Sequence, residues 1–184
     1  MLFPCTTWSR ARWPPLRTSS HLQGLPSLNE NEKSQVDIGN CTYQFACKVV
    51  AAAIRSKVPC VCENPQRSMA WMAPPMSELM MVAIVLDTDM CQYRARWKKR
   101  TKLCGWNMVS QHAGLDLKCS GRGECSLTGK QHIVLTGTVN GVARTRLAQA
   151  YPPALARKLA EWLYRSQELK VYNRLVKSCC GPDH

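Results

Sequence analysis

Apolar positions recur along the chain in patterns that predict alternating helices and strands. Between residues 30 and 57 they follow helical spacing, from Phe45 to Ile54, which predicts one long helix. Short apolar runs at 58–62 and 83–86 predict two buried strands. The pattern therefore predicts a loop, a helix and then strands, which is an α/β order.

The ends of these elements carry their own signals. Ser27-x-x-Glu30 has the form of a capping box at the start of the long helix. Pro74-Pro75 predicts the start of a short helix that runs to about residue 81, and its methionines are expected to fill the core. These core methionines are Met76, Met80 and Met81.

The last third of the chain changes character. Residues 133–135 predict a short strand, and residues 152–176 predict a basic amphipathic helix. The apolar face of that helix is formed by Leu155, Leu159, Trp162 and Leu163. Such a helix either packs on its own domain or contacts a DNA backbone or a protein partner.

Composition adds a charge argument to this pattern. The 184 residues include 25 Lys and Arg against 12 Asp and Glu, a net charge of +13. That excess favours salt-sensitive attraction to the phosphates of nucleic acid. With 45% hydrophobic residues the chain is globular. No apolar run reaches about 18 residues, so we expect no membrane span.

The chain has eleven cysteines and no secretory signal. An odd number of cysteines favours thiols that are free or bound to metal in a reducing compartment over a disulfide framework. Residues 1–29 contain no acidic residue, as in organellar transit peptides, although Pro14-Pro15 argues against that interpretation. Nucleus, cytoplasm and organelle therefore all stay open.

Two residues carry candidate chemistry. Cys5 follows a proline and lies near Arg10 and Arg12, which favour a thiolate. Glu63 ends the strand predicted at 58–62, and ligands of open α/β sheets bind outside the carboxyl ends of the strands. The alternatives are a partly buried thiol in a frayed terminus for Cys5 and an ordinary loop carboxylate that accepts backbone hydrogen bonds for Glu63.

Several short motifs share their order with a known family. They span residues 4–12, 39–40, 63–71, 89–93 and 97–101, and include Pro-Cys-Thr, Gly-Asn and Glu-Asn-Pro. Over residues 3–165 the chain resembles a divergent, virus- or retroelement-like branch of the cytosine-5 DNA methyltransferases. The resemblance implies that the Cys5 thiolate adds to carbon 6 of a flipped cytosine. It also implies that Glu63 acts at nitrogen 3 and that S-adenosylmethionine supplies the methyl group.

The same resemblance implies a DNA-binding segment, for which two registers are open. The literal Gln-x-Arg-x-Arg match selects Gln92, Arg94 and Arg96. The match by context selects Lys98, Lys99 and Arg100. The alternative interpretation is a basic strand edge in contact with solvent.

One part of the family pattern is absent. The glycine loop that surrounds the methyl donor does not occur, and Gly121-Arg122-Gly123 lacks the flanking strand and third glycine. We therefore expect poor binding of S-adenosylmethionine, and a separate chain is a candidate source of the donor-binding half. The resemblance also implies that residues 101–106 return as an antiparallel strand, as the last strands of the family do. Residues 1–106 are therefore expected to form the second half of a doubly wound, Rossmann-like sheet with an exposed apolar edge, followed by an appendage at 107–184.

The appendage contains candidate metal ligands. Cys119, Cys125 and His132 are ligand types that zinc prefers, with Cys91, Cys104 or His112 as a further ligand. Each is equally explained as a buried thiol or a loop histidine.

Two functions follow from the sequence as a whole: a cytosine-5 DNA methyltransferase-like protein, or a non-catalytic basic module that binds nucleic acid and contains zinc.

Overall fold

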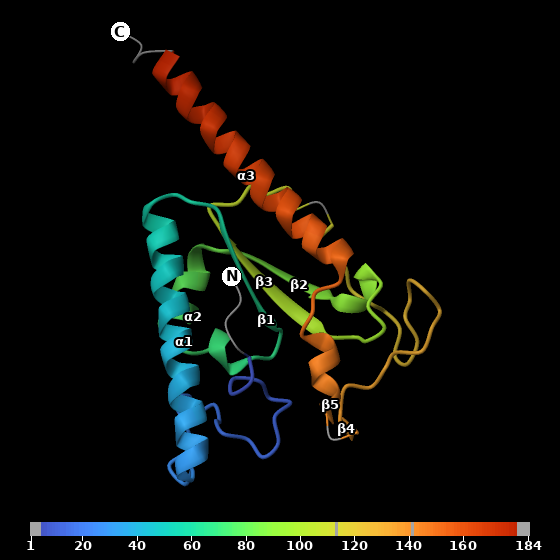
Figure 1. Cartoon of the computed structure of the whole chain (residues 1–184). Coiled ribbons are helices and arrows are strands. Elements are labelled where there is room, and N and C mark those ends of the chain that lie inside the picture. Colours follow the sequence, from blue (N-terminus) through green and yellow to red (C-terminus); the bar gives the residue numbers. More distant parts are fainter. Residues whose placement is uncertain (1–4, 113, 141, 180–184) are drawn as a thin grey trace. The chain divides into compact units, whose positions relative to one another are not determined.

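The computed structural model describes residues 5–112, 114–140 and 142–179 (Figure 1). The chain forms two compact units. The first comprises residues 1–86 and 101–106, and the second comprises residues 87–100 and 107–184. The segment 87–100, which contains the predicted DNA-binding residues, thus belongs to the same unit as the Cys/His region.

The first unit is built on helix α1, Glu30–Arg55. The prediction of a helix over 30–57 is confirmed. Its cap differs from the prediction, because Asn29 accepts a hydrogen bond from the backbone of Glu32, whose carboxylate accepts one from Asn29 N. The same capping pattern therefore operates two residues later than Ser27. One face of the helix, including Tyr43 and Val50, is fully buried.

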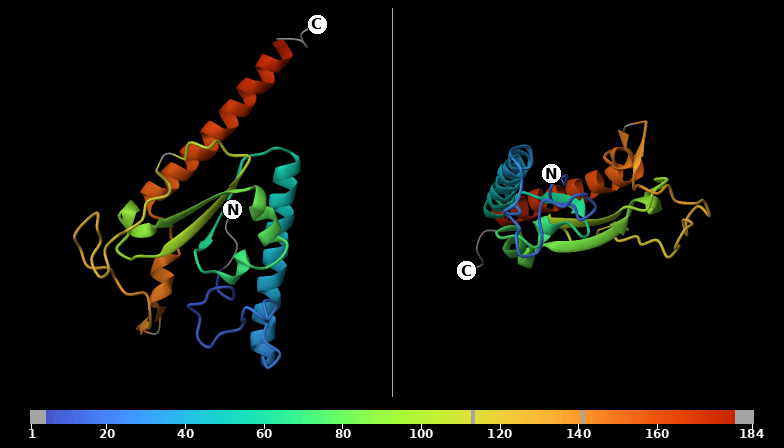
Figure 2. Two further views of the ribbon diagram at one scale, coloured as in Figure 1. Left: turned by 180° about the vertical axis from the view of Figure 1, so that it is seen from behind. Right: turned by 90° about the horizontal axis from the view of Figure 1, so that it is seen from below.

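A three-stranded antiparallel sheet lies beside α1 (Figure 2). Its strands are β1 (Cys60–Pro65), β2 (Ile84–Asp89) and β3 (Arg100–Trp106), in the order β1-β3-β2. Strand β3 pairs antiparallel with β1, with Cys62 opposite Cys104, so the predicted return strand is confirmed. The fold is mixed α/β, and the doubly wound arrangement stays a prediction. Both cysteines join Tyr43 and Trp106 in one core.

Short helices connect β1 to β2. They are η1 (Met69–Trp71), α2 (Met76–Leu79) and η2 (Met80–Val82). Met76 is fully buried, as predicted, and Met80 packs against the core, but Met81 is 85% exposed. The β2 strand is confirmed, although it is not fully buried, because Val85 is 40% exposed.

Few residues of the second unit form β-strands. It contains η3 (Met90–Tyr93), η4 (Arg144–Ala148) and a hairpin of β4 (Thr138–Val139) with β5 (Val142–Ala143). The strand predicted at 133–135 is wrong, because Ile133 bonds instead to a loop, donating its N–H to Arg96 O at 2.7 Å.

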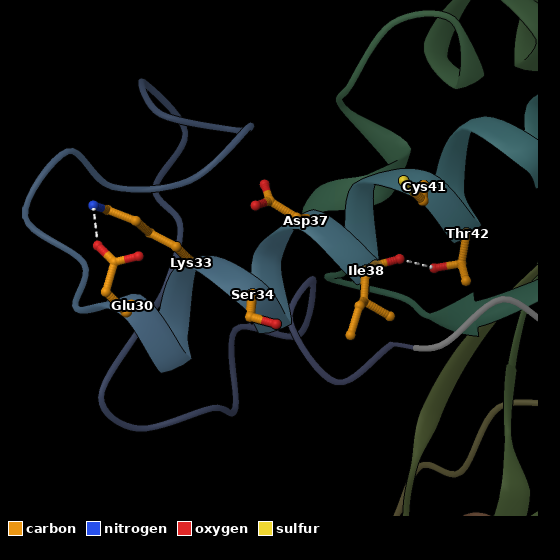
Figure 3. A pocket seen from close by; sticks show the side chains of 7 residues that line it. All are labelled: Glu30, Lys33, Ser34, Asp37, Ile38, Cys41 and Thr42. Carbon is orange, nitrogen blue, oxygen red and sulfur yellow. Dashed lines mark hydrogen bonds and ion pairs between the residues drawn. The ribbon is translucent and has the colours of Figure 1, made fainter.

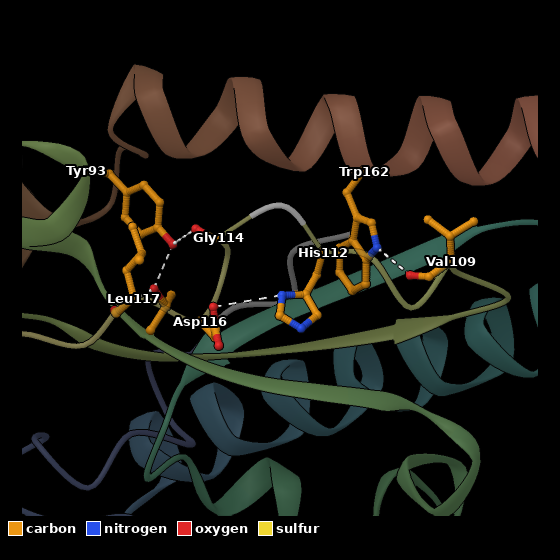
Figure 4. A network of polar contacts seen from close by, with 8 residues as sticks. Tyr93, Val109, His112, Gly114, Asp116, Leu117 and Trp162 are labelled. Atoms are coloured by element: carbon orange, nitrogen blue, oxygen red, sulfur yellow. Dashed lines mark hydrogen bonds and ion pairs between the residues drawn. The ribbon is translucent and has the colours of Figure 1, made fainter.

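Helix α3, Pro153–Cys179, closes the second unit. Its predicted buried face is confirmed for Leu155 and Trp162, and one more helical turn adds Ser166. Trp162 donates its indole N–H to Val109 O at 2.9 Å (Figure 4). In the described part of the chain, no helix combines the length and apolar character that crossing a membrane requires.

Candidate functional site

The loop that carries Cys5 is an ordered turn. The N–H groups of Trp8 and Ser9 both donate to Cys5 O, at 3.1 and 2.8 Å. Cys5 is half-buried. Its backbone is held by these two hydrogen bonds and is not frayed. Pro4, which precedes it in the motif, lies outside the described residues.

Arg17, a residue that sequence reasoning missed as a site residue, holds this loop. It is 1% exposed, and its guanidinium makes five hydrogen bonds of 2.6–3.2 Å. The acceptors are Thr7 O, Thr7 Oγ1, Leu22 O, Val36 O and Asn40 Oδ1. The same guanidinium lies 3.7 Å above the ring of Trp8, a cation–π contact. A buried charge therefore joins the Cys5 loop to α1.

Burial lowers the pKa of Arg17 to about 10, while the nearby Asp37 carboxylate opposes that shift. Arg17 is therefore a cation at neutral pH, as its five acceptors require. A second contact supports the loop, since Trp8 Nε1 donates to Gly39 O at 3.1 Å. A side chain at Gly39 would collide with Thr7 Oγ1. Close approach between loop and helix thus depends on this glycine.

The Cys5 loop also reaches the segment that follows Glu63. The carbonyl of Trp8 accepts a hydrogen bond from Met69 N at 2.9 Å, and Ser68 Oγ approaches it at 3.5 Å. Glu63 itself is 6% exposed. It lies inside β1, not after the end of a strand as predicted, because β1 continues to Pro65 and pairs with β3 throughout.

The predicted DNA-binding residues divide into two groups. Arg94, Arg96 and Arg100 are exposed. Lys98 and Lys99 are half-buried: Lys98 Nζ donates to the carbonyls of Cys119 and Gly121 at 2.7 and 2.8 Å, and Lys99 Nζ donates to Ala148 O. Gln92 donates to Ser126 Oγ at 3.3 Å. The three arginines are thus the residues best placed to meet an external ligand.

Four metal-ligand side chains meet in the second unit. The ligand atoms of Cys91, Cys119, Cys125 and His132 all lie within 4.8 Å of one another, and the three thiols form no disulfide. Of the three candidates for the further ligand, Cys91 is the one that joins the cluster. Cys104 lies in the core of the first unit, and His112 approaches Asp116 at 3.8 Å. A Cys3His group close enough to bind a metal ion is therefore present.

Hydrogen bonds surround this cluster. Ser126 donates from both its N and Oγ to Cys119 Sγ, at 3.4 and 3.5 Å. Burial raises the pKa of Cys119, but these donors outweigh burial and lower the pKa to about 6. Burial raises the pKa of Cys91 to about 12. The backbone N–H of Cys119 donates to Asp89 Oδ2 at 2.8 Å, which orients this ligand further.

A separate hollow lies along the outer face of α1 (Figure 3). It is lined by one helix only, and Lys33 and Glu30 bridge part of it at 2.8 Å. Neither Cys5 nor Glu63 lines it. We therefore assign no chemistry to this hollow.

The site residues that the sequence did not reveal are Arg17 and Gly39. The sequence held a signal for Gly39, because Gly39-Asn40 is one of the family-like motifs; Gly39 O accepts a hydrogen bond from Trp8, and Asn40 accepts one from Arg17. Arg17 carries no such signal in the sequence. No protein-family model, curated protein or solved structure matches the chain.

Proposed function

We propose that the first unit carries the cytosine-binding part of a DNA (cytosine-5)-methyltransferase, with Cys5 as nucleophile and Glu63 as the acid. One observation carries the proposal. Two motifs far apart in sequence are joined where Trp8 O accepts from Met69 N at 2.9 Å. The antiparallel return strand β3 gives further support, because the resemblance implies such a strand in this part of the fold.

The proposed reaction has three steps: addition of the thiolate, methyl transfer and elimination. The Cys5 thiolate forms a bond to carbon 6 of cytosine, the electron pair of the 5,6 double bond moves to form a 4,5 double bond, and the pair of the 3,4 double bond takes a proton from Glu63 at nitrogen 3. Carbon 5 would then attack the methyl group of S-adenosylmethionine, whose sulfur would keep the electron pair of the broken S–C bond and leave as S-adenosylhomocysteine. Removal of the proton from carbon 5 by a base re-forms the 5,6 double bond and expels the Cys5 thiolate, and nitrogen 3 returns its proton to Glu63.

The nucleophile is testable without a methyl donor. Single-stranded DNA containing pyrimidin-2-one should form a covalent adduct with the chain, because this base accepts a thiolate at carbon 6 and needs no extrusion from a duplex. Cys5→Ser should abolish the adduct on a denaturing gel, and Glu63→Gln should slow its formation by about 100-fold. Cys41→Ser, at an exposed cysteine, is the matched control. An adduct that survives Cys5→Ser but disappears with another cysteine would refute the assignment.

A second candidate function concerns the other unit. We propose that it is a basic nucleic-acid-binding module that contains structural zinc. In a tetrahedral site with Zn–S of about 2.3 Å, the sulfurs lie roughly 3.8 Å apart. The four ligand atoms already lie within 4.8 Å of one another, so movements of roughly 1 Å would close the Cys3His group around one ion. The four protein ligands favour a structural over a catalytic ion, since they leave no open position.

Zinc content provides the direct test. The purified chain should contain one zinc ion per molecule by elemental analysis. Cys119→Ser should remove most of it, because it replaces a central thiolate ligand with a poor one. Cys41→Ser should retain the metal. Wild-type protein that contains no zinc after refolding in zinc-containing buffer would exclude this centre.

A further inference from the structure

The metal-ligand cluster fixes the start of the segment that we call the arginine loop, residues 94–96. The loop follows η3, which contains the ligand Cys91. Arg94 N donates to Cys91 O at 3.1 Å, and Arg94 adopts a left-handed conformation with φ of 69°. A residue other than glycine holds that conformation only where its surroundings impose it. The contact with Cys91 is part of what imposes it here.

The far side of the loop is fixed to the other ligands. Arg96 O accepts from the N–H of Ile133 at 2.7 Å, and Ile133 follows the ligand His132. Lys98 Nζ donates to the carbonyl of the ligand Cys119 at 2.7 Å. The backbone of the arginine loop is therefore bonded to residues at or next to two of the four ligands, and the side chain of Lys98, two residues after the loop, is bonded to a third.

The side chains of the loop point to solvent while its backbone is held. Arg94 and Arg96 are exposed. Two more exposed cations, Arg122 and Lys130, lie on the segment between Cys119 and His132, with Glu124 as the acidic residue among them. A rigid loop that presents two arginines suits the phosphates of a nucleic-acid backbone, because little side-chain and loop ordering remains to oppose binding.

We propose that metal binding at the Cys3His cluster organises the arginine loop as a phosphate-binding surface, so that nucleic-acid binding by the second unit depends on the metal. This inference rests on the proposed zinc centre and names what that centre controls. It predicts coupling: the metal and the two arginines act through one surface, so losing both should cost no more affinity than losing either.

The test measures DNA affinity and zinc content on the same samples of full-length chain. The double variant Arg94→Gln/Arg96→Gln should keep its zinc, bind a labelled DNA duplex roughly 10- to 100-fold more weakly at about 0.1 M salt, and lose about 2 from the slope of log affinity against log salt. Removal of zinc from the wild type should weaken binding to a similar extent. Removal of zinc from the double variant should add little, since the effects are not independent.

Three further variants keep the coupling testable if the apoprotein loses its structure. Lys98→Met leaves all four ligands in place and removes the bond to Cys119 O, so it should keep zinc and weaken DNA binding more than the single-charge control Lys48→Gln does. Lys48→Gln/Arg55→Gln matches the charge change of the double variant on exposed positions of α1. This control should change affinity less than the arginine variant does.

The outcomes separate this inference from the zinc proposal. Absence of zinc in the wild type overturns both proposals. Zinc at one per chain, with DNA affinity unchanged by its removal, overturns the coupling alone. Additive losses from zinc removal and from Arg94→Gln/Arg96→Gln also overturn it, because they would show two separate binding surfaces.

Discussion

Replacement of Arg17 by methionine is expected to destabilise the first unit by roughly 3 kcal/mol or more. Methionine retains the apolar stem but leaves the buried acceptors of Arg17 without this donor, and each unsatisfied buried polar group costs about 1–3 kcal/mol. The cation–π contact with Trp8 is lost as well. Because single domains are stable by only about 5–15 kcal/mol, this is a large fraction of the total.

Urea unfolding and hydrogen exchange of residues 5–9 provide the measurement. Arg17→Lys should recover part of the stability, because one ammonium replaces some of the five hydrogen bonds without the planar geometry. Lys48→Met, at an exposed position on α1, should change stability by less than about 0.5 kcal/mol. An unchanged unfolding midpoint in Arg17→Met would show that the network does not hold the Cys5 loop.

Truncation of Trp162 to alanine is expected to cost about 3–5 kcal/mol in the second unit. The side chain is 1% exposed and donates to Val109 O, and the neighbouring N–H of Val109 donates to Ser166 Oγ. Removing the indole therefore opens a cavity and leaves Val109 O without the hydrogen bond that Trp162 donates. Both effects loosen α3 from the segment near residue 109.

The matched control lies on the same helix. Tyr164 is 65% exposed, so Tyr164→Ala should leave the unfolding free energy nearly unchanged. Limited proteolysis then reports where the loss occurs: cleavage near residues 107–112 should accelerate in Trp162→Ala and not in Tyr164→Ala. Equal stability of the two variants would contradict the packing described for Trp162.

The sequence predicted the elements that periodicity governs. Helix α1 follows from the apolar face that contains Val50, and strands β1 and β2 follow from two short apolar runs. The cap was misplaced because Ser27 and Asn29 both begin the same pattern with a glutamate three residues later. Only the path of the backbone distinguishes the two.

The candidate sites depended on contacts that sequence spacing does not encode. Cys119, Cys125 and His132 are near one another in the chain, whereas Cys91 joins them only through the fold, so Cys104 and His112 were equally good candidates. Lys98 had the appearance of a DNA-binding residue, yet it bonds internally to two carbonyls. Burial of a charged side chain such as Arg17 leaves no pattern in a single sequence.

The close approach between Gly39 and Thr7 has a consequence for evolution. Because Arg17 bonds to Thr7 and to Asn40, hydrogen bonds connect the Cys5 loop, the arginine and the Gly-Asn pair, which come from three separate stretches of sequence. A change at one stretch alters the space or charge that the other two require. We therefore expect the three stretches to vary together among relatives, so that searching for them jointly should identify distant relatives better than the Pro-Cys dipeptide alone.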